Sequence, residues 1–73
     1  MRERLDALVA EMVDKGIRLD EAVSEFERRF IKRALDRQQG KICQAAEHLG
    51  IHRNSLSRKM SYLGIVPRPA RRA

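Results

Sequence analysis

The sequence is poor in the residues on which redox, catalytic and membrane-spanning structures depend. Its 73 residues include one cysteine, no tryptophan, two phenylalanines and one tyrosine. A single cysteine cannot form an internal disulfide, and it fits a reducing compartment. No apolar segment approaches the roughly 20 residues of a membrane span, and the charged N-terminus is unlike a signal peptide. We therefore expect a cytoplasmic protein that does not bind membranes.

Signatures of enzymatic and metal chemistry are also missing. No glycine-rich loop followed by Lys-Ser or Lys-Thr is present, so the chain is not expected to hydrolyse ATP itself. The carboxylates are scattered without a paired arrangement. Cys43, His48 and His52 do not have the spacing of a known metal site. The sequence predicts a protein that is not an enzyme and that has no metal, cofactor or small-molecule ligand.

Negative charge is almost absent from the C-terminal part of the chain. Residues 41–73 contain seven Lys or Arg and one acid, Glu47, whereas residues 1–40 contain nine of each sign. This asymmetry indicates a structural part followed by a part that binds a polyanion, of which nucleic acid is the obvious example. An anionic membrane fits less well, because the basic part lacks Trp and Phe and its apolar stripes are short.

Apolar periodicity predicts two helices in the N-terminal part. The first covers residues 1–15 and ends at Gly16, and the second runs from an N-cap at Asp20 to about residue 38. Ile17 and Leu19, in the link between them, are expected to face inward. A monomer this small buries only about 60% of its unfolded surface, so a second copy is expected to complete the core. The apolar faces predict a homodimer interface, and packing within one chain is the alternative. The predicted interface residues are Leu5, Leu8, Val9, Met12, Val13, Val23, Phe26 and Phe30.

Two short apolar stripes flank Gly50 in the segment from Gly40 to Gly64. The stripes consist of Ile42, Ala45, Ala46 and Leu49, and of Leu56, Met60 and Leu63. Glycine can reverse the chain with a positive φ, and two alanines allow a second helix to approach closely. The pattern predicts an all-α, four-helix fold with a dimerisation region at 1–38 and a helix-turn-helix at 39–66. Residues 67–73, which contain two prolines, are predicted to be a flexible basic tail.

The second helix of this unit has a polar and cationic outer face without a carboxylate. A recognition helix inserts its N-terminal end toward the bases, where Arg53 can donate two hydrogen bonds to a guanine edge. Asn54 and Ser57 are further candidates for base or water-mediated contacts. Arg58 and Lys59 are expected on phosphates, which position the protein without reading sequence. An ordinary solvated face is the alternative interpretation.

These features together resemble the helix-turn-helix of the Fis family, which also occurs at the C-terminal end of NtrC-type activators. The resemblance extends from about Leu19 to Ile65. It rests on Gly40, Ala45-Ala46, Leu49-Gly50-Ile51, Arg53, Leu56, Lys59 and Leu63-Gly64, and upstream on Leu19, Phe26-Glu27 and Leu35.

The resemblance implies a homodimer whose first two helices interlock and whose recognition helices lie closer together than one turn of DNA, so that the duplex bends. It assigns base and phosphate contacts to His52, Arg53, Ser55 and Arg58, of which we place His52 on bases and Ser55 on phosphates. It places Lys41, Cys43 and Gln44 near phosphates. His52 and Lys41 stand where better capping residues are expected. Both helix starts are therefore predicted to have free N–H groups that phosphates satisfy.

The sequence thus predicts a bacterial transcription regulator, associated with the nucleoid, that binds and bends specific double-stranded DNA as a homodimer. One alternative is a nonspecific architectural protein of the nucleoid. Another is a helical module whose basic end binds an acidic protein partner. The chain fits either a complete small regulator, which the initial methionine favours, or the end of a larger activator.

Overall fold

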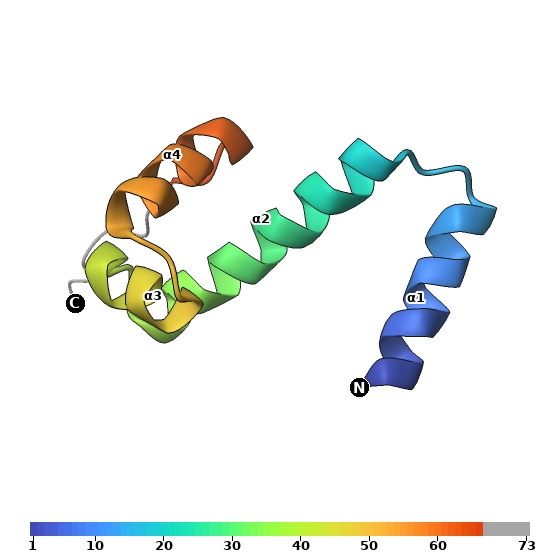
Figure 1. The fold of residues 1–73 in the computed structure, drawn as a ribbon, viewed down its shortest axis with the longest axis horizontal. Coiled ribbons are helices and arrows are strands. Elements are labelled where there is room, and N and C mark those ends of the chain that lie inside the picture. The colour runs from blue at the N-terminus through green and yellow to red at the C-terminus, as the bar shows by residue number, and fades with distance from the viewer. Residues whose placement is uncertain (67–73) are drawn as a thin grey trace.

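The computed structural model describes residues 1–66, which form four helices and no strand (Figure 1). The helices are α1 (Arg2–Asp14), α2 (Leu19–Arg37), α3 (Ile42–Leu49) and α4 (Arg53–Leu63). The predicted all-α fold with four helices is therefore confirmed. The tail predicted at 67–73 lies outside the described residues.

The hydrophobic core joins the C-terminal half of α2 to α3 and α4. Figure 1 shows α3 and α4 gathered at one end of α2. The buried residues are Ile31, Leu35, Ala45, Ala46, Leu56, Met60 and Ile65, and Ile42, Leu49, Ile51 and Leu63 pack against them. Ala45 and Leu56 have no exposed surface, because the small alanine side chain lets α4 approach α3 closely. The recognition helix is thus held by packing on two neighbouring helices.

Helix α1 contributes nothing to this core. It lies beyond the other end of α2 and stands apart from the rest of the chain (Figure 1), and none of its residues is buried. The molecule is correspondingly elongated, with extents of 41 × 24 × 24 Å. The apolar stripe of α1 and the N-terminal half of α2 therefore remain largely uncovered.

Gly50 reverses the chain between α3 and α4 in the manner that the sequence predicts. Its φ is 76° and its ψ is 26°, a left-handed conformation that costs glycine nothing. The backbone N–H of Ile51 donates to the carbonyl of Ala46 at 3.0 Å, which closes the end of α3. Ile51 is thereby placed against the core.

The N-cap predicted for α2 at Asp20 was wrong. The helix begins at Leu19, and the extended residue Arg18 precedes it. The carboxylate of Glu21 accepts from the backbone N–H of Arg18 at 3.4 Å, and that of Asp20 accepts from the N–H of Glu21 at 2.9 Å. The inward orientation predicted for the link was also wrong, since Leu19 is 80% exposed and Ile17 is 39% exposed.

Candidate nucleic-acid interface

The first turn of α4 is fixed by a side chain that the sequence suggested was a poor cap. His52 is the N-cap residue, and its Nδ1 atom accepts a hydrogen bond from the backbone N–H of Asn54 at 3.1 Å. The prediction of an uncapped start for this helix was therefore wrong. A neutral imidazole supplies the acceptor that a serine or asparagine oxygen supplies elsewhere. The Nε2 atom stays available to a ligand.

The start of α3 has the character that the sequence predicts. Lys41 is its N-cap residue, has extended backbone angles and forms no side-chain capping hydrogen bond. The first-turn N–H groups carry the positive end of the helix dipole, which favours an anion nearby. Lys41, Cys43 and Gln44 are all exposed there.

Arg53 and Cys43 connect the starts of the two helices. The Nη1 atom of Arg53 donates to the sulfur of Cys43 at 3.4 Å. This hydrogen bond, with the coulombic attraction to the sulfur, raises the pKa of Arg53 above its ordinary value. The residue predicted to read bases thus lies beside one predicted to lie near phosphates.

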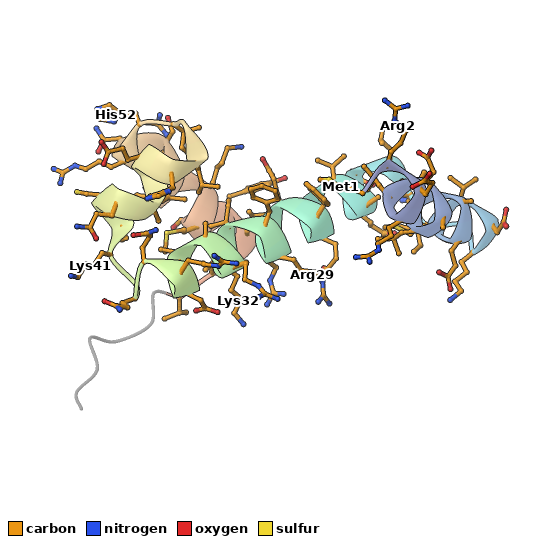
Figure 2. All side chains as sticks on the ribbon, turned by 90° about the horizontal axis from the view of Figure 1, so that it is seen from below. Met1, Arg2, Arg29, Lys32, Lys41 and His52 are labelled. Carbon is orange, nitrogen blue, oxygen red and sulfur yellow. The ribbon has the colours of Figure 1, made fainter. Side chains whose placement is uncertain are left out.

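The remaining candidate residues of α4 divide between its outer face and its flank. His52, Arg53, Asn54, Ser57 and Arg58 are exposed, and Ser55 is half-buried. Figure 2 shows His52 and Lys41 at the end of the molecule remote from Met1. The starts of α3 and α4 thus form one polar, cationic surface, in which Glu47 is the only acid between residues 41 and 66.

Lys59 lies on the side of α4 that faces α2. Its Nζ atom is 2.7 Å from Oε2 of Glu27, and both side chains are partly buried. A helical wheel places Lys59 only on the flank of α4. In the folded chain its ammonium group is engaged by a carboxylate of another helix.

A shallow apolar groove of about 220 Å³ runs beside this ion pair. Its lining residues are Phe26, Glu27, Phe30, Ile31, Leu49, Ile51 and Lys59. The rings of Phe26 and Phe30 are 5.6 Å apart at an interplanar angle of 40°, and both rings are more than half exposed. The groove therefore connects the uncovered apolar face of α2 to the base of the recognition helix.

The family model described as "Bacterial regulatory protein, Fis family" matches residues 22–65. That range includes most of α2 and all of α3 and α4. The chain belongs to the Fis family. Membership makes it a helix-turn-helix regulator that binds double-stranded DNA, and the family is not an enzyme family. No curated protein and no solved structure matches the chain.

Within the described part of this Fis-family chain, no three His, Cys, Asp or Glu side chains gather in a group that could hold a metal ion. No helix between residues 1 and 66 is long and apolar enough to cross a membrane.

Sequence reasoning missed Glu27 as a neighbour of the DNA-binding unit. It lies 32 residues before Lys59, and no local pattern connects two positions so far apart. The Phe26-Glu27 pair belonged to the resemblance to the Fis family, but nothing in the sequence gave Glu27 a partner.

Proposed function

We propose that this Fis-family protein is a sequence-specific regulator of transcription that binds DNA as a homodimer and bends it. The observation that carries the proposal is the continuous polar and cationic surface at the starts of α3 and α4. That surface is rigidly mounted, because Ala45, Ala46 and Leu56 beneath it are buried. A helix end held in this way can enter the major groove and keep its register there.

The residues of this surface take two kinds of role. Bases are read by Arg53, Asn54, Ser57 and the free Nε2 atom of His52. Phosphates are bound by Lys41, Cys43, Gln44, Ser55 and Arg58, which hold the duplex in place. The uncapped start of α3 adds backbone N–H groups to the phosphate contacts. Lys59 was also predicted to contact a phosphate, and its ammonium group also pairs with Glu27 of α2.

Homodimerisation is supported by the apolar side chains that one chain leaves exposed. Those of α1 and α2 are between 43% and 68% exposed at Leu5, Leu8, Val9, Val13, Val23, Phe26 and Phe30, and Met12 is partly buried. An uncovered apolar face of this extent marks an interaction site. A second copy offers the same face, so residues 1–38 serve dimerisation and residues 39–66 serve DNA binding.

In a dimer, the two recognition helices enter successive major grooves. The Fis-like organisation brings them closer together than one turn of straight DNA, so binding bends the duplex. Such a protein works in the cytoplasm on the bacterial nucleoid.

Fluorescence anisotropy with labelled duplexes tests this function. One set of duplexes is selected from genomic fragments for binding, and the other set has random sequences. Both sets are titrated with the protein at several salt concentrations. We expect affinity for selected duplexes to exceed that for random ones by at least about 100-fold, with a steep salt dependence from phosphate contacts. Steep salt dependence without sequence preference would instead indicate an architectural protein. Absence of binding at low salt would favour an acidic protein partner.

A further inference from the structure

The contact between Glu27 and Lys59 joins the two functional parts of the chain. Glu27 lies on α2, beside the exposed rings of the proposed dimer interface, and Lys59 lies on the recognition helix. The 2.7 Å distance corresponds to a charge-assisted hydrogen bond. Side-chain exposures of 43% for Lys59 and 35% for Glu27 show that the pair is shielded more than an ordinary surface pair.

We propose that this ion pair is a positioning contact that fixes the direction of α4 relative to α2. It thereby sets the separation of the two recognition helices in the dimer, and with it the preferred spacing of half-sites on DNA. The inference rests on the proposed function, because it needs two recognition helices that engage one duplex. Glu27 and Lys59 are then positioning residues that act through α4.

The position of the pair supports this role. The core beneath α4 consists of apolar contacts, which hold the helices together but are non-directional. An ion pair with hydrogen-bond geometry adds a directional restraint at the edge of that core. Such pairs contribute little to net stability when partly exposed, so the expected effect is on geometry.

The adjoining groove connects the restraint to dimerisation. Phe26 and Phe30 line it together with Glu27 and Lys59, and the two rings belong to the proposed interface. A second copy of the chain that covers these rings also removes water from the ion pair. Attraction between opposite charges strengthens as the local dielectric falls, so the restraint is strongest in the dimer that binds DNA.

The test uses selected duplexes in which the spacing between the two half-sites is lengthened or shortened one base pair at a time. Fluorescence anisotropy measures the affinity for each spacing. The variants are Glu27→Met, Lys59→Met, the double variant and the exchange Glu27→Lys with Lys59→Glu. Methionine keeps the length of each side chain and removes its charge. Glu25→Met is the matched control, because Glu25 pairs with Arg29 at the same 2.7 Å distance but within α2. Circular dichroism at the binding temperature confirms that each variant is folded.

We expect the wild-type protein and Glu25→Met to prefer one spacing sharply. Each methionine variant at the ion pair should reduce that preference at least about threefold, and the double variant should lose no more than either single one. The exchanged pair should restore the preference. Its affinity should be lower on every duplex, because a new carboxylate lies close to DNA.

Three results would overturn the inference. An unchanged spacing profile in Glu27→Met would show that the pair positions nothing. If Lys59→Met lost affinity equally at every spacing, with a salt slope smaller by about one, and Glu27→Met did not, Lys59 would be assigned to a phosphate contact. If the wild-type protein bound selected DNA without a spacing preference, the ion pair could not set the spacing of half-sites. Failure of the proposed function is a separate result, namely wild-type protein that does not bind DNA.

Discussion

Side chains at the start of α4 divide between holding the helix and facing the duplex. His52 uses Nδ1 to cap the helix at Asn54, and Arg53 rests against the sulfur of Cys43. Rotamers held by neighbours lose less freedom on binding than free ones do. Arg53 therefore meets a base edge with part of its orientation already set.

Replacement of Arg53 by alanine tests base reading. We expect affinity for a selected duplex to fall roughly 5- to 150-fold, because a bidentate contact with one base pair is lost. Affinity for random duplexes should change much less. Arg58→Ala is the matched control, since loss of a phosphate contact should weaken both duplexes alike and reduce the salt slope by about one. Equal losses on both duplexes in Arg53→Ala would remove Arg53 from base reading.

Replacement of His52 by alanine tests its capping role. The free energy of unfolding should fall by about 0.5–2 kcal/mol, the range for loss of an N-cap acceptor. His52→Asn supplies a better capping oxygen and should retain or raise stability. Thermal or urea unfolding followed by circular dichroism measures both variants. If His52→Ala unfolds at the wild-type midpoint, the Nδ1 hydrogen bond has no part in stability.

Among the structural elements, the turn between α3 and α4 depends most on one residue. A Cβ atom at Gly50 would meet no atom within 4 Å, but φ is 76° there. Gly50→Ala should therefore destabilise the fold by about 1–2 kcal/mol through backbone conformation alone. Gly50→Asn should cost less, because asparagine adopts this conformation more readily. Urea unfolding compares the two, and a loss in Gly50→Asn as large as that in Gly50→Ala would contradict the backbone explanation.

The sequence predicted the helix-turn-helix well because its signals are local. Apolar stripes at Ile42–Leu49 and Leu56–Leu63, with Gly50 between them, specify two short helices and a reversal. Helix boundaries were predicted less accurately where several neighbouring residues can cap the helix. At α2, Asp20 looked like the N-cap, but the carboxylate of Glu21 reaches back to Arg18, which is the N-cap residue two positions earlier.

Long-range contacts could not be predicted in this way. A helical wheel orders side chains around one helix, but it does not say how α4 crosses α2. Lys59 appeared as a flank cation for phosphates, and only the packing of α4 brings it to Glu27. The same limit applies to the contact between Arg53 and Cys43, which depends on how the two helix starts meet.

Across the whole molecule, the contrast between its two ends is the main feature. Helices α3 and α4 lie at one end and α1 at the other (Figure 1). The first end contains the packed core and the cationic surface, and apolar side chains of α1 and α2 remain exposed toward the second. Figure 2 shows Arg29 and Lys32 on the side of α2 opposite to His52. These cations are therefore directed away from the proposed interface with bases.

Phe30→Glu tests the proposed dimer. Phe30 is 54% exposed in the single chain, so a charge there costs the monomer little but would be buried without a partner in the dimer. We expect sedimentation equilibrium to give the mass of a dimer for wild type and of a monomer for the variant. Tyr62→Glu is the control, because Tyr62 is an 82% exposed aromatic residue at the other end. A dimer that persists in Phe30→Glu would exclude this face.

In the proposed mechanism, two chains act together on one DNA site. Titration of a labelled selected duplex well above its dissociation constant, with the mass of the complex measured by analytical ultracentrifugation, tests it most directly. We expect saturation at two chains per duplex and a single complex of that mass without a stable one-chain intermediate. Saturation at one chain per duplex would contradict a regulator that reads DNA with paired recognition helices.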